Sequence, residues 1–272
     1  YYLRKPQGAS FSIERVFNDV RNALPQEIHI KVAVSRFQSK GLCARIYNII
    51  EAIFRQEDVN HITGDVHFLA FLLRGKRTVL TIHDLVSIHR LKGFQRLLSI
   101  FFWYWLPIKR VRIVTVISEF TKKDLLRHIN IHPNKIRVIY DPVSPVFQPV
   151  LKEFNQHKPV ILQFNTGKHK NLERVAEALK SISCHLRIIG KLDNEQQLAL
   201  QKSEIDYSVV SSITDDEVLD EYRCCDLLVL ASTFEGFGLP IVEAQATGRP
   251  VVTSNLCSMP EVAGHAACLV DP

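Results

Sequence analysis

The chain has 272 residues, of which 46% are hydrophobic and 23% are charged. This length suits two domains. The composition is that of a soluble protein with sizeable hydrophobic cores, which excludes an intrinsically disordered chain. The six cysteines show neither a metal-ligand spacing nor a C-x-x-C pair, so we expect reduced, mostly buried thiols in a cytoplasmic protein.

The net charge of +6 is unevenly distributed between the two halves of the chain. Residues 1–150 contain 23 Lys and Arg against 11 Asp and Glu, a net charge of +12, whereas residues 151–272 contain 11 against 17, a net charge of −6. A basic half favours an anionic partner. Nucleic acid, an anionic membrane surface and a basic solvated surface without a partner all fit this pattern.

The first half alternates between strand patterns and helix patterns. Residues 1–3 indicate the end of a strand, and a loop of small residues that contains Gly8 follows it. A loop in this position of a doubly wound sheet lies at the ligand-binding edge. The elements expected next are a helix at 11–24, a strand at 28–34, a helix at 41–54, a strand at 59–63 and a helix that opens at 65–67.

Residues 77–84 are rich in β-branched side chains and form an expected strand with His83 at its end. The carboxyl end of such a strand points side chains into the ligand-binding crevice. His83 is therefore a candidate functional residue, and the alternative is a strand-end histidine that is hydrogen-bonded to its neighbour. His61, His67 and His89 are less well placed, and for them we favour a structural role.

Residues 97–108 are the most apolar stretch of the chain. They are too short for a membrane span, which needs about 20 residues. Aromatic residues between cationic clusters are typical of a helix that lies on an anionic bilayer, and an ordinary core-facing helix is the alternative. Both hold if one face is buried and Trp103 or Trp105 lies on the other. The flanking cations are Arg90, Lys92, Arg96, Lys109, Arg110 and Arg112.

Proline residues at 142, 145 and 149 indicate a linker. We therefore expect a first domain over residues 1–145 and a second domain over residues 146–272. The later strands are expected at 111–117, 159–164, 185–190, 207–213, 226–230 and 250–254, with helices between them. Thr214 and Glu217 have the spacing of a capping box, which predicts a helix start.

Lys170 lies where a loop meets the helix that extends to about residue 182. A lysine in this position can bind phosphate as a mobile point charge. A solvated surface lysine is the alternative.

The stretch 226–244 contains the strongest pattern in the chain. An apolar strand is followed by a loop with Gly236 and Gly238, and Pro240 suits the first turn of the next helix. The glycines let the backbone approach a ligand, and a helix N-terminus favours phosphate. Glu235 and Glu243 place two carboxylates beside this site, which suits hydroxyl groups of a sugar nucleotide.

Glu235 and Glu243 are separated by seven residues. With the surrounding Ser-Thr-Phe-Glu-Gly-Phe-Gly-Leu-Pro-Ile-Val-Glu-Ala and the Gly-Arg-Pro-Val-Val at 248–252, they resemble the Glu-x7-Glu block of the GT-B glycosyltransferases of family 4. The Lys-Asn pair at 170–171 and the segments 116–125 and 135–143 resemble the same family.

The resemblance implies a role for each candidate residue. His83 would lie near the anomeric carbon of the donor sugar, Lys170 would contact the diphosphate, Glu243 would hold the ribose and Glu235 would hold sugar hydroxyls. Catalytic roles therefore fall to His83 and Glu235. The implied donor-binding residues are Gly8, Lys170, Glu235, Gly236, Phe237, Gly238, Leu239 and Glu243. No metal ion and no cofactor are expected.

The chain departs from the family pattern in two places. Many family members have an arginine a few residues before the lysine, where this chain has Phe-Asn-Thr at 164–166. Lys168 is a candidate substitute for that arginine. Family members also continue with further helices beyond the position of Pro272, so we expect an incomplete second domain.

The expected fold is α/β, with two facing Rossmann-like domains that contain parallel sheets. The expected function is retaining transfer of a sugar from a UDP- or GDP-sugar to a saccharide or a lipid-linked saccharide in cell-surface polysaccharide or glycolipid assembly. An anionic membrane surface is a further expected partner, and nucleic acid is not, because helix-turn-helix, zinc and RNP patterns are missing from the sequence. The alternative is a sugar-nucleotide-binding or regulatory protein that does not catalyse transfer.

Overall fold

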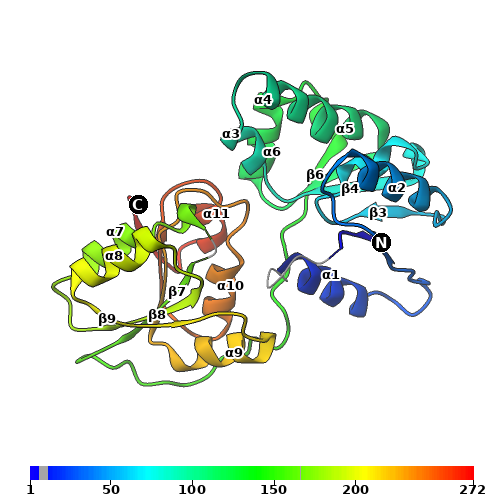
Figure 1. Ribbon diagram of the computed structural model, residues 1–272. Coiled ribbons are helices and arrows are strands. Elements are labelled where there is room, and N and C mark those ends of the chain that lie inside the picture. The colour runs from blue at the N-terminus through cyan, green and yellow to red at the C-terminus, as the bar shows by residue number, and fades with distance from the viewer. Residues whose placement is uncertain (6–11, 166) are drawn as a thin grey trace. The chain divides into compact units, whose positions relative to one another are not determined.

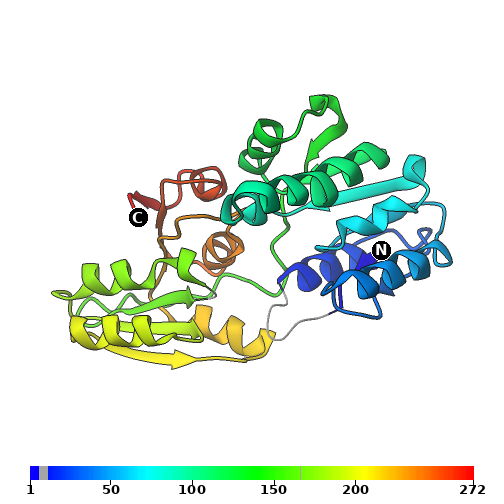
Figure 2. The ribbon, with the colours of Figure 1, turned by 45° about the horizontal axis from the view of Figure 1, so that its top comes forward.

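The computed structural model describes residues 1–5, 12–165 and 167–272 (Figures 1 and 2). The chain forms two compact units, Tyr1–Pro142 and Val143–Pro272. The boundary lies three residues before the expected one at residue 145. Each unit is built on a parallel sheet of six described strands with helices between them. The expected fold class, two Rossmann-like α/β domains, is confirmed.

The sheet of the first unit has the strand order β2-β1-β3-β4-β5-β6. Its strands are β1 (Tyr2–Leu3), β2 (Ala33–Val34), β3 (Asn60–Ile62), β4 (Thr78–Ile82), β5 (Ile113–Val116) and β6 (Ile136–Val138). Its helices are α1 (Ser12–Asn22), α2 (Leu42–Ile53), α3 (Val86–Arg90), α4 (Gly93–Ser99), α5 (Leu106–Arg110) and α6 (Glu119–His128), with 3-10 turns η1 (His67–Phe71), η2 (Gly75–Arg77) and η4 (Pro133–Lys135) and a π-helical segment η3 (Ile100–Trp105). The core lies between this sheet and its helices, with Ile62, Leu80 and Val114 fully buried.

The edge of this sheet differs from the expectation. A strand was predicted over residues 28–34, but only Ala33–Val34 pair with β1. Ile28, Ile30 and Val32 are exposed, so their alternating pattern marks an extended segment that is not part of the sheet. A period of two therefore predicted an extended backbone correctly but not its pairing.

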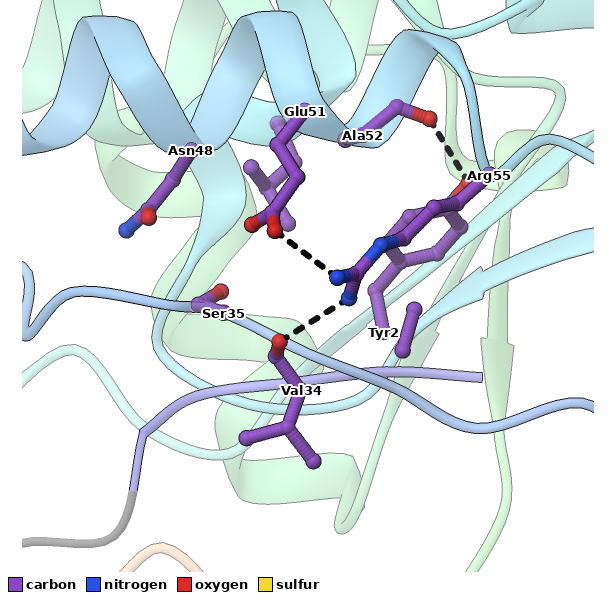
Figure 3. Close-up of a pocket in the computed structure, with 9 residues that line it drawn as sticks. Tyr2, Val34, Ser35, Asn48, Glu51, Ala52 and Arg55 are labelled. Atoms are coloured by element: carbon purple, nitrogen blue, oxygen red, sulfur yellow. Dashed lines mark hydrogen bonds and ion pairs between the residues drawn. The ribbon is translucent and has the colours of Figure 1, made fainter.

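The second helix is fixed over this edge by polar contacts (Figure 3). The hydroxyl of Tyr2 donates to the carbonyl of Ala52 at 3.0 Å, and Arg55 donates to Glu51 at 2.7 Å and to the carbonyl of Val34 at 3.1 Å. The cavity beside them has a volume of about 10 Å³, which is room for at most one water molecule. This cavity is part of the packing and is too small for a ligand.

The aromatic segment at 97–108 is helical but not regular. It runs through α4, the π-helical η3 and α5, and a π-turn shifts the face that later residues present. Tyr104, Pro107 and Ile108 are buried, and Trp103 and Trp105 are half-buried against the core. The exposed apolar residues are Phe94, Leu97, Leu98, Phe101 and Phe102. The helix does have two faces, but naming a tryptophan for the outer face was wrong.

Within the described part of the chain, no helix combines the length and the apolar character that a bilayer span requires.

The sheet of the second unit has the strand order β12-β11-β10-β7-β8-β9. Its strands are β7 (Val160–Asn165), β8 (His185–Gly190), β9 (Asp206–Val210), β10 (Leu227–Leu230), β11 (Val251–Ser254) and β12 (Cys268–Val270). Its helices are α7 (Leu172–Leu179), α8 (Asn194–Ser203), α9 (Asp215–Cys224), α10 (Leu239–Ala246) and α11 (Met259–Ala263), with the 3-10 turn η5 (Lys168–Lys170). The central strands are buried on both faces. Leu162 and Leu228 belong to the core on one face, and Leu186 and Ile188 belong to the core on the other.

The predicted start of α9 is confirmed, because Thr214 and Glu217 form both hydrogen bonds of a capping box. The expectation of mostly buried thiols was wrong. Only Cys184 and Cys225 are buried, whereas Cys257 is half-buried, and the exposed thiols are those of Cys43, Cys224 and Cys268.

Candidate active site

Two neighbouring strands of the second sheet, β7 and β10, are distant in sequence. The chain runs from β7 to β8 on one side and later crosses to β10 on the other side of β7. In open parallel sheets, ligands bind outside the carboxyl ends of strands at such a switch in strand order. Lys170 follows β7, and Glu235 follows β10. The topology therefore brings these two predicted residues to one edge of the sheet.

The loop after β7 holds Lys170 in a buried position. Lys170 is 7% exposed, and the side-chain amide of Gln163 donates to its carbonyl at 3.1 Å. Asn171 follows with φ of 60°, a left-handed conformation that asparagine tolerates better than most residues. This conformation ends the 3-10 turn and starts α7. The alternative of a solvated surface lysine is therefore wrong.

The loop after β10 is shaped by Gly238, which precedes α10. Its φ of +101° lies in the left-handed region, and an added Cβ would lie 3.1 Å from Ile241 Cδ1. Because glycine has no side chain, no side-chain cap covers the N-terminus of α10. The hydroxyl of the fully buried Ser258 hydrogen-bonds the carbonyls of Glu235 and Phe237, each at 2.9 Å. These contacts with Ser258 hold the loop in one conformation.

Lys170 and Glu235 form an ion pair across the two loops. Lys170 Nζ lies 2.6 Å from Glu235 Oε1, and the two side chains are 8% and 13% exposed. The backbone N–H of Thr233 donates to the carbonyl of His169 at 2.8 Å, which joins the loops a second time. A buried ion pair is costly to break by removing one partner. The pair therefore fixes both charged groups at the switch in strand order.

Glu243 lies one turn into α10 and is 3% exposed. Its Oε2 accepts a hydrogen bond of 2.7 Å from the hydroxyl of Tyr222 on α9. The structure therefore places Glu243 on the helix that starts at Gly238, with its carboxylate oriented by a neighbouring helix.

Three buried polar atoms in this region have no hydrogen-bond partner among the described residues: Gln163 Oε1, Asn171 Nδ2 and Ser232 Oγ. Buried polar atoms are satisfied in nearly all native proteins, by protein groups or by bound water. Their presence on and beside β7 and β10 indicates that this edge of the sheet is built to hold a polar group.

His83 lies in the first unit, directly after β4, and is 7% exposed. Its Nε2 is 2.8 Å from the carbonyl oxygen of Thr63, and because a carbonyl only accepts, Nε2 carries the proton. The neutral ring then keeps Nδ1 as an acceptor. The alternative, a strand-end histidine that is hydrogen-bonded within the protein, therefore describes His83 correctly. The same hydrogen bond fixes the tautomer of the ring, which also suits a functional role. Gly8 lies outside the described residues.

The three other histidines that the sequence singles out, His61, His67 and His89, are hydrogen-bonded within the first unit. His89 Nε2 lies 2.7 Å from Asp124 Oδ2. His61 Nε2 is 2.8 Å from Thr81 Oγ1, and His67 Nδ1 is 2.9 Å from the carbonyl of Trp103. Burial lowers the pKa of His61 to about 4. These contacts fit the structural role expected for the three residues.

Sequence reasoning missed several residues that shape this site. Tyr222, Ser258 and Gln163 each contact a site residue, but they lie outside the motif. Gln163 lies inside a predicted strand, where a fully buried amide is itself a signal because it requires a partner. The sequence gives no such signal for Tyr222 or Ser258.

The chain matches two family descriptions that together cover nearly all of it. Residues 14–147 match Glycosyltransferase Family 4, and residues 149–272 match Glycosyl transferases group 1. With the two Rossmann-like units and the Glu-x7-Glu block, these matches define the class: the chain belongs to the family 4 glycosyltransferases of GT-B fold.

Among the similar curated proteins is the O-antigen chain mannosyltransferase RfbU of Salmonella typhimurium, 26% identical over 76% of this chain and 59% of that protein. Another is the O-antigen chain mannosyltransferase B of Escherichia coli, 28% identical over 59% of this chain and 48% of that protein. The chain thus spans about half to three fifths of the length of these relatives.

Solved structures share the fold. HepE of Anabaena in complex with UDP-glucose matches all of this chain and 85% of its own, with a TM-score of 0.74 and 16% identity. WaaG, a glycosyltransferase involved in lipopolysaccharide biosynthesis, matches with the same coverage, a TM-score of 0.69 and 14% identity.

Proposed function

We propose that this protein transfers a sugar from a nucleoside-diphosphate donor to a hydroxyl of a saccharide acceptor, with retention at the anomeric carbon. The observation that carries the proposal is the buried Lys170–Glu235 pair beside the start of α10, at the switch in strand order. A cation for a diphosphate and a carboxylate for sugar hydroxyls are held there before any ligand binds, which is the preorganisation that catalysis needs.

In this reaction the bond between the anomeric carbon and a diphosphate oxygen breaks. The acceptor oxygen forms the new bond to that carbon, and the acceptor proton passes to the leaving diphosphate. Lys170 has three N–H donors, of which Glu235 accepts one, so Lys170 can contact a phosphate oxygen while it stays paired. The N-terminus of α10 at Leu239 adds positive potential at the same place.

The remaining roles follow from the donor's other groups. Glu235 accepts hydrogen bonds from hydroxyls of the sugar and Glu243 from those of the ribose. The backbone of Gly236, Phe237 and Gly238 lies along the phosphates. His83 accepts a hydrogen bond from the donor sugar through Nδ1, because its Nε2 is bound to Thr63.

Lys170 and the helix start supply the positive charge for the leaving group, so we propose that transfer needs no metal ion. The test is a transfer assay in excess EDTA, with the product anomer read by NMR. Retained activity and retained configuration support the proposal. Loss of activity that magnesium or manganese restores contradicts the metal-free part, and an inverted product contradicts the stereochemistry.

The identities of the relatives narrow the donor. Two are named O-antigen chain mannosyltransferases, which favours a mannosyl donor and a role in cell-surface polysaccharide assembly. HepE was solved with UDP-glucose, which favours uridine. The transfer rates of four donors, UDP-mannose, GDP-mannose, UDP-glucose and GDP-glucose, should therefore be compared in one assay. The comparison of UDP-mannose with GDP-mannose decides which base the protein accepts.

The first unit also carries a surface suited to the cytoplasmic face of a membrane. Phe94, Leu97 and Phe102 are 74%, 62% and 50% exposed on α4 and η3. Lys92, before this segment, and Lys109 and Arg110, after it, are exposed as well. Apolar side chains next to cations favour peripheral binding to anionic lipid. This position suits an acceptor that is carried on a lipid.

One observation favours the alternative, a sugar-nucleotide-binding protein without transfer. Lys168, the candidate substitute for the missing arginine, is exposed and paired with Glu195 at 2.5 Å, and Asn165 is bonded to Lys191 and Gln196. Both side chains are therefore engaged by other protein groups. Slow hydrolysis of the donor in the absence of acceptor supports the transferase, whereas tight donor binding with neither hydrolysis nor transfer supports the alternative.

A further inference from the structure

Three side chains that the proposed transfer does not use converge on the surface of the first unit. His89 is on α3, and Asp124 and His128 are one helical turn apart on α6. His89 Nε2 lies 2.7 Å from Asp124 Oδ2, and His128 Nε2 lies 3.5 Å from Asp124 Oδ1. All three ligand atoms lie within 4.8 Å of one another. Two imidazole nitrogens and one carboxylate form a common ligand set for divalent transition metals.

We propose that His89, Asp124 and His128 bind one divalent transition-metal ion of the zinc class. Four-coordinate zinc with bonds of about 2.0–2.1 Å keeps its ligand atoms about 3.3 Å apart. The observed separations of the two histidine nitrogens from Asp124, 2.7 and 3.5 Å, bracket this value. The two nitrogens lie within 4.8 Å of each other, so the imidazole rings move closer together when the ion binds. The site lies in the first unit and does not depend on the proposed transfer, whose donor residues lie in the second unit.

The backbone around the three ligands is fixed by the core. Ile88 precedes His89 and is fully buried, and Leu125 follows Asp124 and is also fully buried. Asp124 itself is 3% exposed, whereas the side chain of His89 is 40% exposed. A buried carboxylate with an accessible imidazole beside it gives a metal ion both a firm anchor and an entry path.

The protons of the site must move when the metal binds. His89 Nε2 donates to Asp124 Oδ2 at 2.7 Å, because a carboxylate only accepts. His128 Nε2 lies 3.5 Å from Asp124 Oδ1, and its Nδ1 accepts from Arg96. A metal ion bound at Nε2 needs that nitrogen free of its proton, so in the metal-bound form each ring carries its proton on Nδ1.

Arg96 on α4 opposes the presence of a proton on His128 Nδ1. Its Nη2 lies 3.3 Å from His128 Nδ1, and its Nε donates to the carbonyl of Ile88. A guanidinium only donates, so it cannot accept the proton that Nδ1 carries in the metal-bound form. Its charge also repels a cation. Arg96 must therefore turn aside when the ion enters, and it acts as a gate that lowers the affinity.

The test uses the full chain with the exposed Cys43, Cys224 and Cys268 changed to serine, which removes competing thiolates. Zn²⁺ is titrated against a chromophoric chelator, and Co²⁺ is followed by its visible absorption. We expect one ion per chain, loss of binding in the His89→Gln/His128→Gln double variant, and unchanged binding in His157→Gln, an exposed histidine of the second unit. Circular dichroism checks that each variant is folded.

The gate gives a second, independent readout. Arg96→Gln keeps all three ligands and offers an acceptor to His128 Nδ1, so the affinity should rise by about tenfold, within the range that outer-shell partners of metal ligands contribute. Absence of stoichiometric binding in the parent chain, or equal binding in the double variant, overturns the site. An Arg96→Gln affinity that is unchanged or lower overturns the assignment of His128 Nε2 as a ligand.

Discussion

The carboxylate of Glu243 has two tasks that a single substitution can separate. It accepts from Tyr222 in the free protein and, in our proposal, from the ribose of the donor. Glu243→Gln keeps an oxygen for Tyr222 but removes the charge. Because hydrogen bonds to charged groups contribute about 1.5–3 kcal/mol, donor affinity measured by calorimetry should fall by about one to two orders of magnitude.

Tyr222→Phe is the matched control, since it removes the orienting hydroxyl and leaves the carboxylate. It should weaken donor binding by less, about 0.5–1.5 kcal/mol. Unchanged affinity in Glu243→Gln, with an unchanged melting temperature, would remove Glu243 from the donor site.

His61 predicts a specific pH dependence of stability. Burial lowers its pKa from 6.5 to about 4, so between these values the unfolded chain binds a proton that the folded chain excludes. Stability is therefore lost as the pH falls through this window. This residue should account for about 2 kcal/mol of the loss between pH 7 and pH 5.

Urea denaturation of the wild type and of His61→Gln at both pH values measures this contribution. Burial raises the pKa of Asp141 to about 6, which acts with the opposite sign in the same window, so the difference between the two proteins is the relevant quantity. If the free energy of unfolding changes equally with pH in both proteins, His61 is not the residue whose protonation the folded state disfavours.

At the scale of single residues, the motif predicted the positions of Lys170 and Glu235 because both belong to contiguous patterns. It did not predict that they pair, since 65 residues separate them and only the strand order brings them together. Tyr222 and Ser258 were not predicted for the same reason. Their importance lies in contacts that no local spacing encodes.

At the scale of elements, the loop between β10 and α10 depends on Ser258. Ser258→Ala removes the one hydroxyl donor that the carbonyls of Glu235 and Phe237 share, which should cost about 1–3 kcal/mol of unfolding free energy. Donor affinity should also fall, because the loop carries Glu235. Denaturation and calorimetry measure the two effects.

The control is Ser254→Ala, which is equally buried and whose hydroxyl oxygen accepts a hydrogen bond from the backbone of Leu256. It should lower stability without a change in donor affinity. If both variants bind the donor as the wild type does, Ser258 supports the fold and not the site.

The elements themselves were predictable where periodicity and packing agree. The central strands β7, β8 and β10 read as apolar runs because parallel strands are buried on both faces. The short β2 was overpredicted, since the residues before it alternate without pairing, and β6 and β12 were missed. The π-helical η3 lies beyond any reasoning from a period of 3.6, which is why the exposed face of this segment was assigned to the wrong aromatic residues.

At the scale of the whole molecule, the asymmetric charge predicts salt-sensitive binding of the first unit to anionic vesicles. The side chain of Arg96 hydrogen-bonds Ile88 and His128, so the residues to neutralise are Lys92, Lys109 and Arg110. With about 1 kcal/mol for each cation, Lys92→Gln/Lys109→Gln/Arg110→Gln should weaken co-sedimentation with phosphatidylglycerol vesicles by about a hundredfold.

A second variant separates the apolar contribution. Phe101→Ser/Phe102→Ser should also reduce co-sedimentation, whereas Leu151→Ser, a fully exposed leucine of the second unit, should not. Wild-type protein that stays in the supernatant at low salt would show that the exposed face of α4 and η3 does not bind lipid.

The central claim is that the buried Lys170 binds the diphosphate of the donor, and calorimetric titration with UDP and GDP tests it most directly. We expect one site per chain for one of the two nucleotides. Lys170→Gln should weaken binding by about tenfold to a hundredfold, as the loss of a charge-assisted hydrogen bond predicts. Lys168→Gln, which removes an exposed lysine two residues away, should leave the affinity unchanged. Binding of neither nucleotide by the wild type, or equal losses in the two variants, would contradict the claim.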